Sequence, residues 1–477
     1  LHSTSRRQRQ MCIRDSIDVD DAFYDEDLDY RNTMEKMIRE RRKLCPVKME
    51  YSRLLDEKVI VTLCKELKLN KDQIYYSEAP LSMSFISQIR DKLHGKKDLF
   101  YVRRVPQNSR YVRSSLSMME QIEAGDILLS YPFESMQPFI RLLNEAGENE
   151  KVVSIKMTLY RVAKNSQIVE ALINAAENGK EVVVLVELRA RFDEENNIEW
   201  SRRLEDAGCR IIYGIDHIKV HSKLCLITYC DGTEVKHITQ IGTGNYNEQT
   251  AKLYTDLSLM TANQDIAEEA AQVFNRLCMA QVMEETHHLL VAPKCLQNKV
   301  LDFIEEEICH ADNNEPAYIG VKMNSLTDKT IIDKMVEASQ HGVKIDLVVR
   351  GICCLIPGIE GYTENIRVIS IVGRYLEHSR IYIFGTPERD KMFISSADFM
   401  TRNTVKRVEV ATPIYDTAIK DRVRTMFGIM LHDTVKGREL CRDGNYYRRE
   451  KPQEESEVIS SQAYFSNEAY LAASKNV

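Results

Sequence analysis

The chain has 477 residues, and 43% of them are hydrophobic, so it can bury several cores and global disorder is excluded. Its 65 basic and 72 acidic residues give a net charge of −7, which argues against a general nucleic-acid coat. A negative net charge does not exclude binding of an anionic ligand, because a few arginines can create a positive field inside a cleft. No apolar run approaches the roughly 18 residues of a membrane helix. The 12 cysteines include no C-x-x-C pair and predict no zinc site; as scattered thiols they indicate a reducing cytoplasm.

The two ends of the chain differ from the rest. Residues 1–16 (LHSTSRRQRQMCIRDS) are basic and lack the apolar core of a signal peptide, so we expect a non-native leader. Residues 17–107 mix helix and strand patterns, with a charged helix near 32–43, and predict a partial α+β head domain. The basic stretch 101–115, which contains Pro106, is typical of a linker. Residues 451–477 form a polar tail that we expect to fray.

Residues 108–290 alternate between strand and helix patterns. We predict a strand over 151–159, an amphipathic helix over 166–178, a β-branched strand over 181–188 and, after another helix, a strand over 224–228. Apolar strands separated by helices are typical of a sheet that is covered by helices on its faces. The sequence therefore predicts the α/β fold class for this first domain.

Residues 291–450 repeat this pattern and predict a second domain of the same kind. The segment IVEALINAAENGKEVVVLVEL at 168–188 returns as IIDKMVEASQHGVKIDLVVRG at 331–351. Gly179 and Gly342 align, each where a helix is expected to end. The internal repeat predicts two α/β domains that follow the partial head.

A histidine, a base and an acid occur in each copy. H-S-K-L-C-L-I begins at His221 and places Lys223 two residues on, and H-S-R-I-Y-I-F begins at His378. Asp256 follows G-T-G-N by 11 residues, and Glu409 follows S-S-A-D by 11 residues. Two such halves packed face to face would place both histidines in one cleft, although duplicated folds also keep duplicated residues for packing alone.

These residue types suit phosphate chemistry. If a carboxylate such as Asp256 or Glu409 holds one ring N–H, the other ring nitrogen is a nucleophile or a base. The base two residues after each histidine points to the same face of the strand, so a cation lies beside each imidazole. The G-T-G-N turn could bring backbone N–H groups to an oxyanion. No G-x-x-x-x-G-K-[ST] is present, so a nucleotide would bind without a P-loop.

Arginines cluster around both units. Arg161 ends K-M-T-L-Y-R, Arg191 lies in E-L-R-A-R-F-D-E-E, Arg350 ends a strand, and Arg407 follows S-S-A-D. A guanidinium binds phosphate oxygens in pairs, which suits phosphoryl transfer. The alternative for Arg161 and Arg191 is a surface salt bridge, since acids lie near at 193–195. Asp256 and Glu409 could likewise be ordinary surface acids.

Several long motifs stand in order along the chain. They are K-M-T-L-Y-R-V-A-K at 156–164, E-L-R-A-R-F-D-E-E-N-N-I at 187–198, K-V-H-S-K-L at 219–224, I-G-T-G-N-Y-N-E-Q-T-A-K-L-Y-T-D at 241–256, V-V-R-G-I-C-C-L-I-P-G at 348–358, R-Y-L-E-H-S-R-I-Y-I-F at 374–384 and S-S-A-D-F-M-T-R-N at 395–403. Together they make the sequence resemble type 1 polyphosphate kinase from about Ile17 to about Tyr447.

The resemblance implies two phospholipase D-like domains and reversible transfer of the ATP γ-phosphate to polyphosphate through a phosphohistidine. The phosphorylated histidine of the family matches His221, and its second essential histidine matches His378. Family residues that contact ATP match Tyr254, Arg350 and His378. Positions assigned to Mg²⁺ match Arg161 and Arg191. A guanidinium only donates hydrogen bonds, so we interpret these two as holding the phosphates that Mg²⁺ bridges.

The resemblance also carries expectations about partners and completeness. The implied partners are ATP or ADP and inorganic polyphosphate, with Mg²⁺ as cofactor, in a cytoplasmic homo-oligomer that binds no nucleic acid and has no transmembrane segment. Peripheral membrane association is left open. Chains of the family begin with a further helical domain that lends an Asn to the adenine site. No room for it exists before Ile17, so we expect an N-terminally truncated chain.

Two alternatives use the same residues. A phospholipase D-like phosphodiesterase has a similar histidine pair, but its pattern needs Asp five residues after the Lys. Thr228 and Gly385 occupy those positions here, which disfavours hydrolysis. The third alternative is a non-catalytic protein that binds polyphosphate, which predicts binding without formation of ADP.

Overall fold

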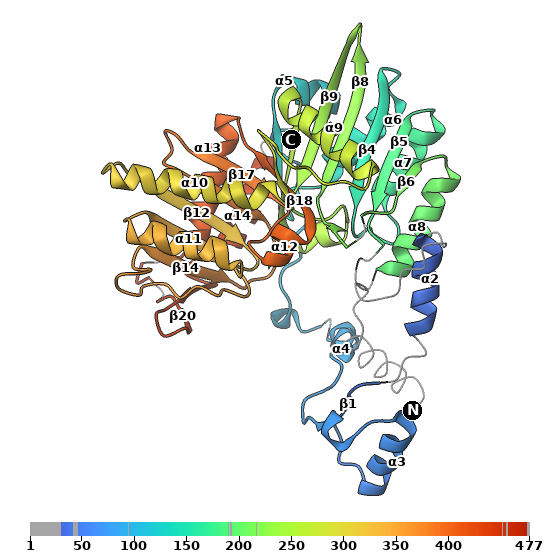
Figure 1. Ribbon diagram of the computed structural model, residues 1–477, viewed down its shortest axis with the longest axis vertical. Coiled ribbons are helices and arrows are strands. Elements are labelled where there is room, and N and C mark those ends of the chain that lie inside the picture. The colour runs from blue at the N-terminus through green and yellow to red at the C-terminus, as the bar shows by residue number, and fades with distance from the viewer. Residues whose placement is uncertain are drawn as a thin grey trace. The chain divides into compact units, whose positions relative to one another are not determined.

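The computed structural model describes residues 30–41, 46–93, 95–188, 190, 193–215, 217–450, 452–454 and 457–474. It divides the chain into one unit up to Arg103 and a second from Arg104 onward (Figure 1). The expected leader over 1–16 lies outside the described residues, and the boundaries that we expect for the domains stay predictions. No helix in the described ranges has both the length and the apolar composition to cross a membrane.

The first unit contains short elements. The helix expected near 32–43 is α2 (Tyr30–Arg41), and β1 (Met49–Tyr51) pairs in parallel with β2 (Ile74–Tyr76). Helix α3 (Glu57–Leu67) begins where the Asp56 side chain accepts a hydrogen bond from the backbone N–H of Lys58. The remaining elements are η2 (Lys71–Gln73), α4 (Phe85–Lys92) and η3 (Lys97–Leu99).

The first half of the second unit is built on one mixed sheet with the order β15-β10-β9-β8-β4-β5-β6, and β3 pairs with β10. Helices α6 and α7 contact β4 and β5, whereas α9 packs on β8 and β9. The elements are α5 (Met118–Ala124), β3 (Ile127–Tyr131), α6 (Gln137–Glu148), β4 (Val152–Leu159), α7 (Gln167–Glu177), β5 (Glu181–Val186), α8 (Glu194–Asp206), β6 (Arg210–Ile212), β7 (Lys219–Val220), β8 (Leu224–Asp231), β9 (Glu234–Gly242), η4 (Thr250–Lys252), β10 (Tyr254–Thr261) and α9 (Gln264–Cys278).

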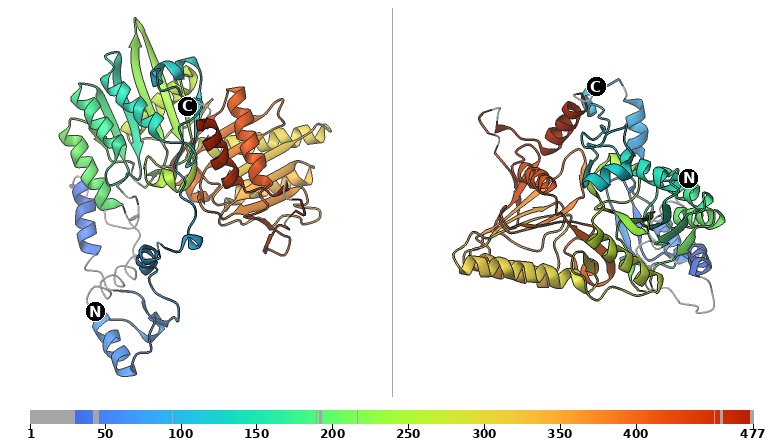
Figure 2. Two further views of the ribbon diagram at one scale, coloured as in Figure 1. Left: turned by 180° about the vertical axis from the view of Figure 1, so that it is seen from behind. Right: turned by 90° about the horizontal axis from the view of Figure 1, so that it is seen from above.

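The second half has a sheet with the order β11-β18-β17-β16-β12-β13-β14-β19-β20. Figure 2 shows α13 and the dark red α14 beside each other on this half. The elements are β11 (Leu290–Ala292), α10 (Cys295–Asp312), β12 (Tyr318–Met323), α11 (Lys329–Gln340), β13 (Lys344–Val349), β14 (Ile366–Ile371), β15 (Leu376–Glu377), β16 (Arg380–Phe384), β17 (Lys391–Ser395), α12 (Thr401–Val405), β18 (Arg407–Pro413), α13 (Thr417–Leu431), β19 (Gly437–Leu440), β20 (Tyr446–Arg448) and α14 (Ser461–Ser474).

Alternating burial gives this second sheet two apolar faces. Leu347 packs in one core with Val300 of α10, whereas its neighbour Val348 packs in another core with Phe427 of α13 and Phe465 of α14. Successive side chains of a strand point to opposite faces, so one apolar run serves both layers of helices.

The two halves share one topology, which confirms the predicted internal repeat and α/β fold class. In the first half, β4 pairs in parallel with β5 and antiparallel with β8, the strand that follows His221. In the second half, β12 pairs in the same way with β13 and with β16, the strand that follows His378. Gly179 and Gly342 directly follow the capping residues of α7 and α11 with φ of 80° and 88°, as their alignment predicted.

The halves also exchange short strands. β7, which ends at Val220, pairs in parallel with β18 of the second half, and β15, which ends at Glu377, pairs in parallel with β10 of the first half. A shared core of α9, β8 and β18 residues, among them Phe274, Leu224 and Val410, lies between the halves. Each exchanged strand is followed at once by one of the two histidines.

Candidate active site

His221 is held against an acid of the opposite half. Because Val220 pairs with Val408, the next residue in β18, Glu409, lies beside His221. The His221 Nδ1 atom is 2.9 Å from both carboxylate oxygens of Glu409, whose side chain is fully buried. Glu409 also accepts hydrogen bonds from Ser396 Oγ and Asn403 Nδ2, each at 2.5 Å. The carboxylate is therefore fixed before any substrate binds.

His378 is held in the same way by the first half. Its Nδ1 atom is 2.8 and 3.0 Å from the two oxygens of Asp256, and its backbone N–H donates to Thr255 Oγ1. Thr243 Oγ1 donates to Asp256 at 2.6 Å. The pairing is thus crossed, since each histidine bonds the acid that belongs to the other copy of the repeat.

The G-T-G-N turn packs against this acid. A Cβ atom at Gly244 would lie 2.1 Å from Asp256 Oδ2, so the carboxylate occupies the space that a side chain would take. The backbone N–H of Thr243 already donates to the carbonyl of Leu257. The expectation that this turn offers its N–H groups to a ligand is wrong for Thr243, because strand pairing uses that group.

A cation lies beside each imidazole, as the His-x-base spacing predicted. Lys223 is 1% exposed and its ammonium donates to the His221 carbonyl. Arg380 Nη1 lies 3.2 and 3.3 Å from the ring nitrogens of His378, and Arg380 also pairs with Asp398 through two nitrogens. Each histidine therefore lies near a basic side chain.

Burial and these charges keep the imidazoles neutral. Burial, followed by the charges of Lys223 and Arg407, holds the pKa of His221 well below its ordinary value. Burial also lowers the pKa of His378, and Asp256 only partly opposes it. A neutral ring that donates Nδ1–H to a carboxylate keeps a lone pair on Nε2. That lone pair is what a nucleophile or a base requires.

The candidate ATP-binding residues lie around His378. The Tyr254 ring centroid is 5.3 Å from that of His378. Arg350 donates through Nε and Nη2 to Asn324 Oδ1 at 3.1 and 2.9 Å, and the Asn324 amide in turn donates to Asp398. Burial lowers the pKa of Arg350, aided by the charge of Arg380.

The three remaining predicted arginines differ in placement. Arg407 Nη1 is 3.9 Å from Glu409 Oε1, so this side chain lies at the His221 pair. Arg161 Nε lies 2.9 Å from Asp193, the salt bridge that was the alternative to a phosphate role. Arg191 lies outside the described residues. The structure thus places Arg407 beside the His221–Glu409 pair, whereas Arg161 forms a salt bridge with Asp193.

Family models match the chain in three consecutive parts. The polyphosphate kinase middle domain matches residues 7–89, C-terminal domain 1 matches 117–283, and C-terminal domain 2 matches 289–462. The chain belongs to the polyphosphate kinase family. This confirms the resemblance found in the sequence.

Individual relatives agree with this membership. A polyphosphate kinase of Bacillus anthracis is 44% identical over 421 residues, which cover 88% of this chain and 60% of that protein. One of Staphylococcus epidermidis is 44% identical over 438 residues, 91% of this chain and 59% of that protein. The crystal structure of polyphosphate kinase from Porphyromonas gingivalis matches with a TM-score of 0.80 and 33% identity, over 89% of this chain and 65% of that one. The chain spans about 60% of the length of these curated relatives.

Sequence reasoning missed several residues of this candidate site. The Tyr160 ring meets the His221 ring edge-on, with centroids 4.7 Å apart. Asn324, at the end of β12, links Arg350 to Asp398. Strand pairing places Tyr160 and Asn324 at equivalent positions after β4 and β12. Aligning the repeat one strand earlier would have found both.

The donor set fits phosphate oxygens better than a bare metal ion. Among the described residues no group of three or more His, Cys, Asp or Glu side chains could hold a metal. Asp256 and Glu409 are already hydrogen-bonded to the two histidines. Mg²⁺ keeps several waters and is often bound through substrate phosphates, so the site fits a Mg²⁺ that arrives with a nucleotide.

Proposed function

We propose that the chain transfers the γ-phosphoryl group of ATP reversibly to inorganic polyphosphate through a phosphohistidine at His221. The supporting observation is the crossed pair of buried histidines, each with Nδ1 on a carboxylate of the other half. Lys223, Arg407 and Arg380 add positive charge around His221, and these charges lower its pKa further after burial has done so. Phosphoryl transfer needs a placed nucleophile and charge neutralisation, and this arrangement supplies both.

In the first step His221 Nε2 attacks the γ-phosphorus of ATP. The new N–P bond forms as the bond from the γ-phosphorus to the bridging oxygen breaks, and ADP carries away that electron pair. The imidazole gains positive charge, which the Glu409 carboxylate at Nδ1 offsets. Lys223 and Arg407 neutralise the phosphoryl oxygens.

His378 and its neighbours serve the departing nucleotide. His378, Arg380 and Arg350 stabilise the charge on the ADP oxygens, and the Tyr254 ring beside His378 contacts the nucleotide. A terminal oxygen of polyphosphate then attacks the phosphorus, the N–P bond breaks, and His221 regains its lone pair. An N–P bond keeps much of the transfer potential of the anhydride, so ADP can take the group back.

Arg161 and Arg191 would hold phosphate oxygens of the substrate, as their match to the family positions implies. Mg²⁺ carried by the nucleotide would supply further charge neutralisation to its phosphates. For Arg161 this proposal requires that the salt bridge with Asp193 opens or that Arg161 also binds phosphate beside it. Both side chains are partly exposed, so a phosphate can reach Arg161. The arginines donate and the acids stay with the histidines, so the residues do not compete for the ion.

The test is covalent labelling. The chain is expected to take label from ATP carrying ³²P in the γ-position and none from the α-position, in an acid-labile and base-stable form. Polyphosphate should remove the label as chain growth proceeds, and ADP should return it to ATP. Absence of label together with retention of polyphosphate would favour the binding protein instead.

The phosphodiesterase alternative makes a different product in the same assay. It predicts hydrolysis of a diester substrate, with a released alcohol or nucleotide. The hydroxyl of Thr228, where that family needs Asp, is 3.0 Å from His237 Nδ1, and Gly385 has φ of 99°. Neither position offers a carboxylate, so we expect no diester hydrolysis.

The pH dependence of labelling follows from two buried groups. The pKa of His221 lies below 6.5, so kcat/KM is expected to remain high down to that pH and to fall only in stronger acid. Burial lowers the pKa of Lys223 to about 7, so the chain without substrate loses this positive charge, and kcat/KM falls, as the pH rises through that value.

Lys223→Met gives the matched measurement. In this variant kcat/KM is expected not to fall as the pH rises above 7. Its kcat/KM should equal, at every pH from 7 upward, the low kcat/KM that the wild type reaches only at alkaline pH. An unchanged alkaline fall in Lys223→Met would assign it to another group. In the unfolded chain the pKa of His221 is near its ordinary value, so the unfolded chain binds more protons below pH 6.5 and acid favours unfolding. Rates are therefore compared only at pH values where the circular dichroism spectrum is that of the native protein.

We propose a cytoplasmic enzyme that acts as a homo-oligomer on ATP and polyphosphate, with peripheral membrane association left open. Gel filtration with light scattering tests the oligomer, since a mass of 55.1 kDa would indicate a monomer.

A further inference from the structure

β15 (Leu376–Glu377), the strand that directly precedes His378, is only two residues long. On one side it pairs with β10, where Leu376 donates to the Leu253 carbonyl and Glu377 lies opposite Thr255. Two residues of pairing hold a segment weakly, because few hydrogen bonds offset its loss of conformational entropy. Other contacts must therefore keep His378 in place.

Gln462, the second residue of α14, supplies such contacts. Its side-chain carbonyl accepts from the Tyr375 N–H at 2.9 Å, and its amide donates to the Tyr375 carbonyl at 2.9 Å. The same amide donates to Glu377 Oε1 at 2.7 Å. Gln462 is 7% exposed, so it takes the place that a neighbouring strand would have beside β15.

Glu377 carries this contact to both sides of His378. Its second oxygen accepts from Thr255 Oγ1 at 2.9 Å and lies 3.1 Å from Lys322 Nζ. Thr255 Oγ1 in turn accepts from the His378 N–H, and Lys322 donates to the carbonyl and hydroxyl of Ser379. Glu377 and Lys322 are 4% and 1% exposed, so water does not compete for these bonds.

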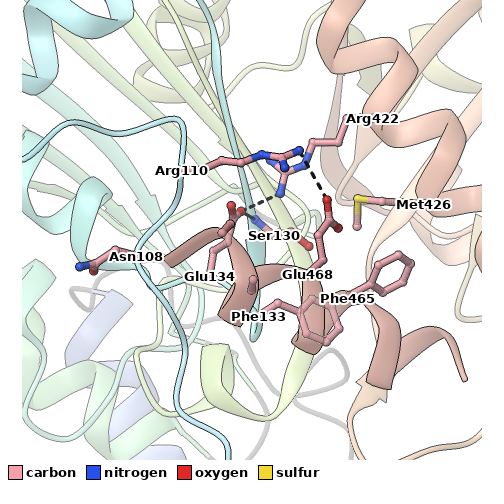
Figure 3. A pocket seen from close by; sticks show the side chains of 11 residues that line it. Asn108, Arg110, Ser130, Phe133, Glu134, Arg422, Met426, Phe465 and Glu468 are labelled. Carbon is pink, nitrogen blue, oxygen red and sulfur yellow. Dashed lines mark hydrogen bonds and ion pairs between the residues drawn. The ribbon is translucent and has the colours of Figure 1, made fainter. Parts of the chain in front are cut away.

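The helix that carries Gln462 is itself anchored. The Ser461 N–H and hydroxyl both donate to Asp433 Oδ2 at the start of α14. Farther along, Phe465 packs 5.4 Å from Phe133, and Glu468 pairs with Arg110 (Figure 3). Through these contacts α14 packs against the first half of the second unit as well as against β15.

We propose that Gln462 is a positioning residue for His378, acting through Tyr375 and Glu377. Before His221, Val220 occupies the position that Glu377 has before His378. The backbone N–H of Val220 donates to Glu187 within the first half. The inference rests on the proposed function for its catalytic consequence. Its structural part, the placement of the His378 ring, is measurable without turnover.

Two substitutions disturb the same contact from opposite sides. Gln462→Ala removes the amide, and Gly373→Ala places a Cβ atom 2.5 Å from Gln462 Oε1 without altering α14. Gly373 has no positive φ, so alanine adds no backbone strain there. Ser466→Ala is the matched control, because it removes a buried hydrogen bond within α14 that does not reach β15.

The measurement is the titration of the His378 ring by NMR in histidine-labelled protein, with the signal assigned by His378→Gln. Burial lowers the pKa of this ring, and the charged or titratable groups around it are Asp256 and Tyr254 from β10, Arg380 from β16, Asp398, His221 and Lys223. We expect both Gln462→Ala and Gly373→Ala to move the titration midpoint up toward 6.5, because water reaches a loosened ring. Ser466→Ala should leave it unchanged.

A double variant makes the result decisive. In Gln462→Ala the added Cβ at residue 373 has room, so Gly373→Ala should cause no further shift. Unchanged His378 titration in both single variants, with native circular dichroism, would overturn the inference. If the wild-type chain takes label from ATP, both variants should also slow labelling by about tenfold. If it takes none, the proposed function fails while the NMR result still decides the role of Gln462.

Discussion

His221→Ala is expected to abolish covalent labelling from γ-labelled ATP, with a loss on the order of 10⁴-fold or more, the scale on which removing a nucleophile lowers a rate. The reason is geometric as well as chemical. His221 Nδ1 is fixed on Glu409, Lys223 donates to its carbonyl, and the Tyr160 ring closes one side.

Two controls separate this loss from unfolding. His341→Ala replaces an exposed histidine that pairs with Asp312 and should keep full labelling. His378→Ala should lower the rate of labelling, yet label that does form should remain on His221. Label that persists on His221→Ala at the wild-type level would show that another residue accepts the phosphoryl group, and the proposed mechanism would then be wrong.

Gly244→Ala is expected to lower the labelling rate by about 10²-fold, the effect of displacing a catalytic group by about 1 Å. The added Cβ atom would lie 2.1 Å from Asp256 Oδ2 and 2.3 Å from its carboxylate carbon, so the carboxylate must move. His378 then loses its Nδ1 partner, and Thr243 loses the acceptor of its hydroxyl. The rate is measured beside the thermal midpoint of unfolding.

Gly125→Ala is the matched control, since Gly125 has an extended φ of 172° and no atom within 4 Å of the added Cβ. Asp256→Ala should reduce labelling about as much as Gly244→Ala, and the double variant should be no slower than either single variant. Additive losses would mean that the glycine acts through something other than Asp256.

Much of the fold was readable from residue patterns alone. The repeated segments at 168–188 and 331–351 predicted two α/β halves, and Gly179 and Gly342 were placed correctly at the ends of α7 and α11. Apolar runs and helical periods report burial within about 20 residues, so they suffice for such units. The repeat also singled out His221, His378, Asp256 and Glu409 as the residues to examine.

The same patterns could not show which acid serves which histidine. Asp256 and Glu409 each stand in the same copy as the histidine that they do not bond; the bonded partners are 188 and 122 residues apart. The crossing depends on β7 and β15, two residues each, which are too short to show a strand period. The contact of Gln462 with β15 was missed because we expected residues 451–477 to fray; that expectation is wrong for 461–474, which form the packed helix α14.

Local composition therefore determined the residue types, the elements and the repeated units of this chain. The packing of one half on the other decided the chemistry, because only the exchanged strands bring each imidazole to a buried carboxylate and lower its pKa. Such contacts depend on the free energy of burying two large surfaces against each other, and this free energy cannot be inferred from the sequence of one segment.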